Sequence, residues 1–177
     1  MDAIALMTIA TEIVSPDARL RLRLAGTADE PFLRDLFKSV KGAQLATAGL
    51  PPAMRDLVLA QQYRAQVAGY AAQCPAAQSL IILRDGAPVG RLLLDRAASR
   101  WHVVDLALLL GARNAGVGRE IMQAVATAAR EQGAAVLSLA VATANEDAMR
   151  FYVRLGFQDV ADGANASHRK MELTLAR

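Results

Sequence analysis

The segment from Val103 to Glu120 constrains the fold more than any other part of this chain. It starts with an apolar run as far as Leu110, passes through a short connection that contains Gly111, Gly116 and Gly118, and continues with apolar residues at helical spacing. This pattern predicts a buried strand, a tight loop and a helix. Because glycine lets a ligand approach the main chain and the first N–H groups of a helix have no intrahelical partner, the loop suits a phosphate group.

The patterns on either side of this segment predict the remaining elements. Leu20–Leu24 alternates apolar and charged residues, as a strand with one buried face does. Asp85-Gly86 joins two apolar runs and favours a hairpin turn with positive φ angles. We expect further strands at residues 79–84, 89–96, 101–109, 136–141, 157–161 and 170–175, and further helices at 27–40, 53–72 and 146–155. This order predicts an α+β fold, with one mixed, mostly antiparallel twisted sheet of about six to seven strands and about four flanking helices.

The length of the chain favours a single domain. Its 177 residues suit one core, and the 54% hydrophobic content supplies the apolar surface for it. Residues 1–18 show no clear period and end in Ser15-Pro16-Asp17, so we assign them to an N-terminal extension. Residues 19–177 then form the domain.

The composition argues against several classes of function. The net charge is +3, and no basic run marks a nucleic-acid or membrane-binding surface. Cys74 is the only cysteine and no Cys/His cluster has metal-site spacing, so we expect a reduced, cytoplasmic protein without structural zinc. No run of roughly 18 apolar residues is present, and the apolar stretch 3–10 lacks a basic leader, so we expect neither a membrane span nor a signal peptide.

Spacing decides among the known phosphate-binding loops. Gly111 and Gly116 have the separation of a Walker loop, but Val117-Gly118 follows them where that loop needs Lys and then Ser or Thr. The dinucleotide fingerprint needs a third glycine where Ile121 stands. Both classes are therefore disfavoured.

Two motifs resemble those of the GNAT superfamily of N-acetyltransferases. Arg113-x-x-Gly116-x-Gly118 after an apolar strand is similar to its acetyl-CoA signature, and Asn145–Phe157 resembles its second motif, N-x-x-A-x-x-x-Y-x-x-x-G-F. The turn at Ala87–Arg91 also looks like the family's G-x-P-V-G turn. The resemblance covers roughly residues 20–175 and implies a GNAT-like sheet that splays open to receive the cofactor.

The resemblance implies a set of acetyl-CoA contacts. The main chain of the strand before the loop lies along the pantetheine arm, and the loop holds the pyrophosphate. The residues implied in these contacts are Leu106, Ala107, Leu108, Arg113, Asn114, Ala115, Gly116, Val117, Gly118, Arg119 and Asn145. For Asn145, an N-cap role is an equally good interpretation.

The resemblance also implies catalytic roles. Main-chain N–H groups near Leu108 are the implied oxyanion donors. Tyr152 matches the tyrosine that often protonates the coenzyme A sulfur, although a half-buried helix aromatic is the plainer interpretation. Asp105 is our candidate for the base, because a carboxylate in an apolar strand is costly without a purpose; a structural hydrogen-bonding role is equally compatible.

The acceptor side is less informative. Gln62, Gln66 and Tyr70 share a helical stripe that suits either a polar pocket or a solvated face. His102 neighbours Asp105 and is a candidate proton shuttle, although a lone histidine is more often structural. The acceptor is expected to be an amine of a small molecule or a protein, and the sequence leaves its identity, the acyl-chain length and the oligomeric state open, including a homodimer.

Three departures from the family pattern support a rival hypothesis. Leu110 stands where the family usually has proline, Asn114-Ala115 replaces a basic pair, and residues 141–143 lack an acidic residue common in relatives. A catalytically degenerate module that binds coenzyme A or another ligand for sensing or assembly is therefore the alternative to an active enzyme.

Overall fold

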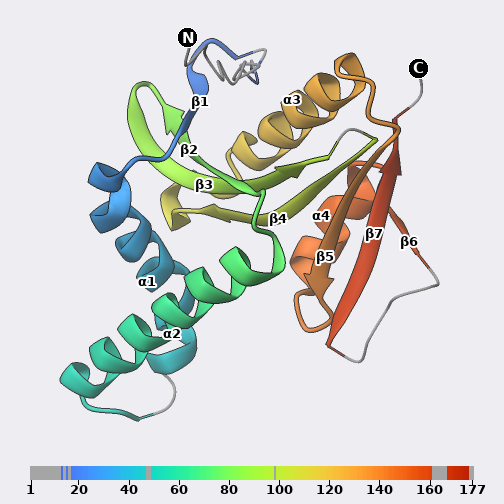
Figure 1. Ribbon diagram of the computed structural model, residues 1–177. Helices are drawn as coiled ribbons and strands as arrows, with labels where there is room; N and C mark the ends of the chain where they lie inside the picture. Colours follow the sequence, from blue (N-terminus) through green and yellow to red (C-terminus); the bar gives the residue numbers. More distant parts are fainter. Residues whose placement is uncertain are drawn as a thin grey trace, which may run out of the picture.

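The fold is one mixed β-sheet with helices on both faces, as Figure 1 shows. The computed structural model describes residues 13 and 15 and the ranges 17–46, 49–97, 99–160 and 167–175. In these residues the sheet has seven strands in the order β1-β2-β3-β4-β5-β7-β6, and four α-helices accompany it. Only the β4–β5 pair is parallel; the other neighbours are antiparallel. The predicted α+β class and the predicted mostly antiparallel sheet are confirmed.

The elements follow the sequence patterns closely. The strands are β1 (Leu20–Leu24), β2 (Gln78–Arg84), β3 (Ala87–Arg96), β4 (Arg100–Leu108), β5 (Val136–Ala142), β6 (Gln158–Asp159) and β7 (His168–Thr174). The helices are α1 (Glu30–Ala46), α2 (Pro52–Gln73), α3 (Val117–Glu131) and α4 (Glu146–Arg154), with short 3-10 turns η1 (Thr27–Asp29) and η2 (Leu110–Ala112). The hairpin turn between β2 and β3 has the expected positive φ angles, 52° at Asp85 and 80° at Gly86.

The two faces of the sheet are covered differently. Helices α3 and α4 pack on one face and enclose the main core, in which Ile121, Val125 and Leu137 are fully buried. Helices α1 and α2 lie on the opposite side (Figure 1) and share a small cluster centred on Phe37, Leu59 and Tyr63. Leu59 and Tyr63 are the buried residues of α2, and most of its other residues are exposed, so this helix projects from the sheet.

The parallel pair β4–β5 is short, and this opens the sheet. Residues Arg100–Val103 pair with Val136–Leu139, and the pairing stops there although both strands continue. Opposite β3, Leu93 pairs with Asp105 and Leu94 with Val103, so Val104 is an extra residue in a β-bulge. Because a bulge bends its strand, β4 turns away from β5 beyond this point.

The strand near residue 157 is shorter than expected, and the N-terminal extension is only partly described. The strand expected at residues 157–161 is limited to β6, because Phe157 packs into the core instead of joining the strand. Of residues 1–18, the structure describes Ile13, Ser15 and residues 17–18; Ile13 contributes to the main core. The boundary at residue 18 stays a prediction. No helix in the described ranges is both long and apolar enough to span a bilayer.

Candidate active site

A deep cleft lies where β4 and β5 separate. Its volume is about 1430 Å³, and its walls come from both of those strands, from α1 and α2, from the loop before α3, and from α4 and β7. The cleft therefore joins both faces of the sheet. Its two ends, one at the start of α3 and the other on the opposite face of β4, are built differently.

The loop that precedes α3 presents a row of free main-chain donors. Asn114 and Gly116 adopt left-handed conformations, with φ angles of 56° and 82°, which turn the chain sharply into the helix. The first helical bond is from the N–H of Glu120 to the Gly116 carbonyl, at 3.1 Å. Among the described residues, the six N–H groups from Asn114 to Arg119 have no acceptor. Donors of this kind at a helix N-terminus suit a phosphate.

Close packing and charge complete this end of the cleft. A Cβ atom on Gly118 would lie 3.4 Å from Phe151 Cζ and 3.7 Å from Leu108 Cδ1, so the first turn of α3 lies against both α4 and β4. Four arginines line the cleft here: Arg113, Arg119, Arg150 and Arg154. The residues present therefore fit the pyrophosphate of acetyl-CoA in size, donors and charge.

The main chain of β4 faces the gap with alternate residues. The N–H of Leu109 donates to the carbonyl of Val89 on β3, at 2.9 Å. Because alternate residues of a strand point their polar groups to the same side, Ala107 also faces β3, while Leu106 and Leu108 face the gap. The Arg113 guanidinium donates from Nε to the Leu108 carbonyl at 3.0 Å, which fixes the arginine at the mouth of the gap.

Tyr152 projects from α4 into the gap. It is half-buried and packs against Phe151 and Phe157, with ring centroids 5.1 and 5.6 Å away. Burial, and then the negative charge of Asp105, raise the pKa of the phenol to about 12. The hydroxyl group therefore keeps its proton at neutral pH, as a general acid must.

Asp105 lies on the opposite face of β4, at the other end of the cleft. Its Oδ2 atom forms an ion pair with Nη2 of Arg91, which is only 8% exposed, whereas 26% of the Asp105 side chain is exposed. The guanidinium lies over the Tyr70 ring, 5.7 Å from the centroid. Burial, and then the charge of Asp105, raise the pKa of Tyr70 to about 12. Asp105 is thus held by one oxygen, and its exposure leaves the other accessible from the cleft.

Arg91 was missed in the sequence analysis, although a signal was present. An arginine interrupts the apolar run Val89–Leu94 of β3, and a charged residue in such a run needs a buried partner. The partner, Asp105, interrupts the next strand in the same way. The two interruptions lie on neighbouring strands, where Arg91 pairs with Ala107 and Leu93 pairs with Asp105.

His102 is the second polar side chain on this face of β4. The Ser138 hydroxyl donates to the Trp101 carbonyl at 3.1 Å and accepts from His102 Nδ1 at 3.0 Å. This network assigns the proton of the neutral ring to Nδ1 and leaves a lone pair on Nε2. Burial lowers the pKa of His102, with smaller effects from Asp95, which raises it, and from Arg100 and Lys170, which lower it.

The remaining predicted site residues fall into two groups. Gln66, Tyr70 and Asn145 line the cleft, and the Asn145 side chain also caps α4 by accepting from the N–H of Ala148 at 3.2 Å. Gln62 is exposed and does not line the cleft. The side chains of Ala115 and Val117 do not line it either; Val117 is buried in the core.

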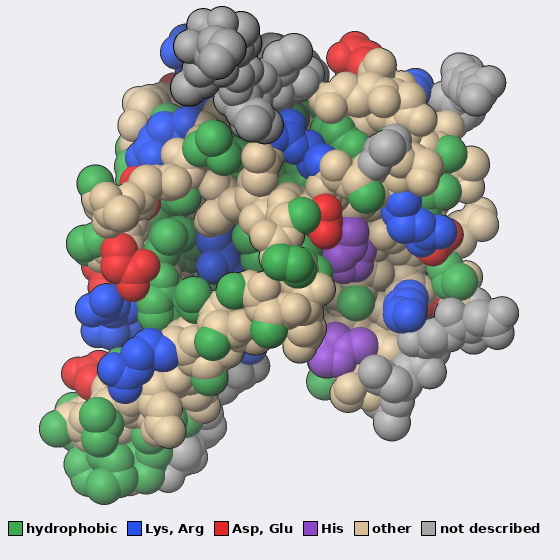
Figure 2. Space-filling model, viewed as in Figure 1, with side chains coloured by type: hydrophobic (Ala, Val, Ile, Leu, Met, Phe, Trp, Pro, Cys, Tyr) green, Lys and Arg blue, Asp and Glu red, His purple; other side chains and the backbone are tan. Residues whose placement is uncertain are grey.

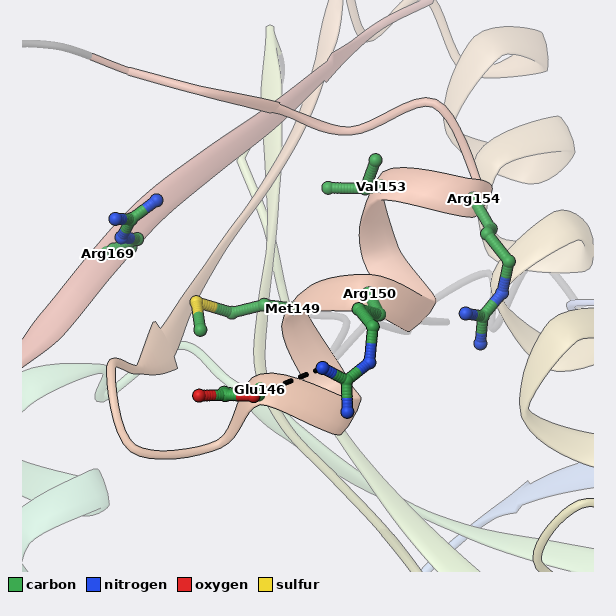
Figure 3. A pocket seen from close by; sticks show the side chains of 6 residues that line it. All are labelled: Glu146, Met149, Arg150, Val153, Arg154 and Arg169. Atoms are coloured by element: carbon green, nitrogen blue, oxygen red, sulfur yellow. Dashed lines mark hydrogen bonds and ion pairs between the residues drawn. The ribbon is translucent and has the colours of Figure 1, made fainter.

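A shallower depression of about 490 Å³ lies on the outer side of α4, as Figure 3 shows. Arg150 donates there to Glu146 at 3.1 Å, and Arg169 of β7 borders the other side. Arg150 and Arg154 border both this depression and the main cleft. The depression adjoins the cofactor end and contains none of the polar groups of β4. No cluster of His, Cys, Asp and Glu in the described ranges suits a metal ion.

Comparisons with known proteins agree with this geometry. The family model described as Acetyltransferase (GNAT) family matches residues 50–157. The fold is similar to the PaiA N-acetyltransferase of Thermoplasma acidophilum in complex with coenzyme A, with a TM-score of 0.65 and 16% identity over 88% of this chain and 98% of that one. An acetyltransferase of Thermus thermophilus has a similar fold, with a TM-score of 0.63 and 20% identity over 93% of this chain and 99% of that one. For YncA of Salmonella typhimurium, solved with acetyl-CoA, the TM-score is 0.52 and the identity is 19% over 89% of this chain and 95% of that one.

Proposed function

The chain belongs to the GNAT family of acetyltransferases, and on this premise we propose that it transfers an acetyl group from acetyl-CoA to a primary amine of a small molecule or a protein. The observation that carries the proposal is the row of unpaired N–H groups from Asn114 to Arg119, beside a gap between β4 and β5. Solved proteins of this fold contain coenzyme A or acetyl-CoA.

We assign the cofactor contacts to the α3 end of the cleft. Acetyl-CoA supplies an activated thioester carbonyl when it is bound. The N–H groups of residues 114–119 and the surrounding arginines hold its diphosphate, and the main chain of Leu106 and Leu108 lies along its arm. The N–H groups of these two residues also stabilise the negative charge that develops on the carbonyl oxygen.

The reaction moves one proton from nitrogen to sulfur. An amide bond forms and a thioester bond breaks; the amine loses a proton, and the departing sulfur gains one. Tyr152 donates to the sulfur, because its raised pKa keeps the phenol protonated. The open oxygen of Asp105 binds the ammonium group of the acceptor, which loses one proton before attack to Asp105 or to Nε2 of His102, and from there to solvent. The second proton leaves the nitrogen after the amide bond forms and replaces the one that Tyr152 gives to the sulfur.

The departures from the family pattern are compatible with an active enzyme. Asn114 adopts a φ angle of 56°, a conformation that asparagine accepts more readily than other side chains with a Cβ atom. Leu110 is 63% exposed in the 3-10 turn η2, which ends at Ala112, before the residues with free N–H groups. The residues that replace the family's usual ones at these two places therefore keep the loop geometry that cofactor binding needs, which an active enzyme and a coenzyme A-binding module share; thiol release separates the two.

Two measurements on the full chain test the proposal. Acetyl-CoA at 100 times its Kd is expected to stabilise the folded state by about 2.7 kcal/mol, which raises Tm by about 5–10 °C. Thiol release from acetyl-CoA is then measured with a panel of amines. No change in Tm excludes cofactor binding, and a Tm increase without thiol release from any amine supports the sensing or assembly module instead.

A further inference from the structure

We propose that the acceptor amine also carries a carboxylate group, and that Lys170 of β7 binds this carboxylate. The inference rests on the proposed function and names the substrate class of the same site. It follows from which side chains share the open face of the sheet, from their register, and from the charges that remain unpaired there.

The first observation is that Lys170 and Asp105 lie on the same face. Leu137, Leu139 and Met171 point into the core beneath α3 and α4, so their neighbours in sequence point the other way. Lys170 pairs with Ala140 of β5, and both are exposed. His102, which lies on this face with Asp105, contacts Ser138 of β5.

The second observation is the register of the strands. The parallel pairing of β4 and β5 ends at Val103 and Leu139, and Ala140, the partner of Lys170, is the next residue. Lys170 therefore stands two strands from β4, close to the level at which Asp105 follows the bulge. Two regular strand spacings amount to about 10 Å between main chains; the divergence of β4 from β5 lengthens this span, and the side chains of Lys170 and Asp105 shorten it. A short molecule with an amine and a carboxylate fits between them.

The third observation concerns charge. Glu172, the neighbouring carboxylate on the same face of β7, forms an ion pair with Arg100, and Asp105 is paired with Arg91. Within the described ranges, Lys170 has no ion-pair partner. Its positive charge reaches the cleft, because it is one of the groups that lower the pKa of His102.

The opposite wall of the cleft contributes a further positive charge and apolar side chains. Helix α1 contributes Lys41 together with apolar side chains, among them Leu36 and Phe37. Among the described residues that line the cleft, Lys41 and Lys170 have no ion pair, whereas the carboxylates are paired, Asp105 with Arg91 and Asp147 with Arg150. Figure 2 shows both histidines of the chain on this face, beside basic side chains. A second ammonium group on the acceptor is repelled here, and a carboxylate is attracted.

Matched amines test the inference without confusing chain length with charge. We use straight chains of two to six carbons, each as an ω-amino carboxylate, a plain alkylamine and a diamine, and measure thiol release from acetyl-CoA. At one or more lengths, kcat/KM is expected to be at least ten times higher for the amino carboxylate than for the alkylamine, and lowest for the diamine.

Charge reversal identifies the residue. Lys170→Glu is expected to lower kcat/KM for the amino carboxylate at least tenfold and to bring the diamine to the level of the alkylamine or above. The matched control is Arg64→Glu, because Arg64 is exposed on α2 and does not line the cleft. It should keep the wild-type order. Both variants should keep the Tm increase with acetyl-CoA.

Three results overturn the inference. Equal rates for the three series, or an unchanged order in Lys170→Glu, reject it and leave the proposed function in place. An Arg64→Glu effect equal to that of Lys170→Glu shows that only the net charge matters, and also rejects it. No thiol release with any amine rejects the proposed function, and the inference with it.

Discussion

The two ends of the cleft are built by different means. At the α3 end, the binding groups are main-chain N–H groups of consecutive residues, Asn114 to Arg119, with the gap-facing main chain of β4. At the acceptor end, they are side chains from separate elements, such as Arg91 of β3, Tyr70 of α2 and Lys170 of β7. The first end depends on local backbone conformation, and the second depends on how distant elements pack.

This difference predicts how each end responds to substitution. A main-chain site tolerates changes of side chain, as Asn114 and Ala115 illustrate, but not an added group that fills the space of the ligand. A side-chain site changes with each residue that forms it. The two ends should therefore be separable: substitutions at one end should affect cofactor binding, and those at the other should affect the acceptor alone.

The largest effect is expected for Gly118→Asp. The new carboxylate stands among the free N–H groups and repels a diphosphate, so the Tm increase with acetyl-CoA should disappear and turnover should fall below detection. The measurement is thermal denaturation with and without acetyl-CoA, together with thiol release.

Gly118→Ala separates charge from crowding in that experiment. A Cβ atom there lies 3.4 Å from Phe151, a contact that a small shift of the ring relieves, so alanine should keep most of the Tm increase. Equal losses in both variants mean that steric crowding is the cause. If the Tm increase is retained in Gly118→Asp, the diphosphate binds elsewhere, and the loop before α3 is not the cofactor end of the cleft.

The next largest effect is expected for Tyr152→Phe. Loss of the phenol proton should lower kcat by about 10² to 10⁴-fold, the range for loss of a general acid. The ring contacts with Phe151 and Phe157 remain, so the folded state and cofactor binding should be unchanged. Since the pKa of Tyr152 is about 12, the phenol stays mostly protonated up to about pH 11. At lower pH, its ionisation should therefore have no effect on the wild-type rate.

Tyr63→Phe is the matched control, because Tyr63 lies in the cluster between α1 and α2 and donates to Glu30 at 3.0 Å. It should cost about 1 kcal/mol of stability and leave kcat unchanged. If kcat falls equally in both variants, or in neither, Tyr152 is not the proton donor.

Sequence patterns pointed to the α3 end as the candidate cofactor site for a physical reason. Left-handed turns favour glycine or asparagine at fixed positions, and Gly116 and Asn114 occupy them. The signals lie within a few residues of one another, as do the strand and helix around them. The fold class followed from similar local patterns: the Asp85-Gly86 turn and the alternation in Leu20–Leu24 both appear in the structure.

The acceptor end was only partly predictable, because its contacts are long-range. The helical stripe of Gln62, Gln66 and Tyr70 was visible in the sequence, but the orientation of α2 on the sheet brings only the last two to the cleft. Arg91 and Asp105 are 14 positions apart, and the bulge at Val104 sets their relation. Lys170 reaches the site through the order of strands, which no local pattern specifies.

The smallest effect is expected for Asp105→Asn, which tests whether the two ends are separate. The amide oxygen still accepts from Arg91, but this buried guanidinium loses its counter-charge, so the Tm without ligand should fall while the further Tm increase with acetyl-CoA is retained. Loss of a charged contact with the acceptor should lower kcat/KM by about 10 to 150-fold. An increase in KM alone assigns the proton to His102, and a fall in kcat assigns it to Asp105. Asp56→Asn, an exposed site on α2, is the control.

The same variant has a readout that needs no substrate. The charge of Asp105 raises the pKa of both Tyr152 and Tyr70, and its removal makes each phenolate less unfavourable. Both pKa values should therefore fall in Asp105→Asn, which an ultraviolet absorbance titration detects, whereas Asp56→Asn should match the wild type. If the phenol titration is unchanged, Asp105 does not act electrostatically on both walls of the cleft. If instead the Tm increase with acetyl-CoA is lost, the two ends are coupled through β4, because Asp105 and the gap-facing Leu106 are adjacent on that strand.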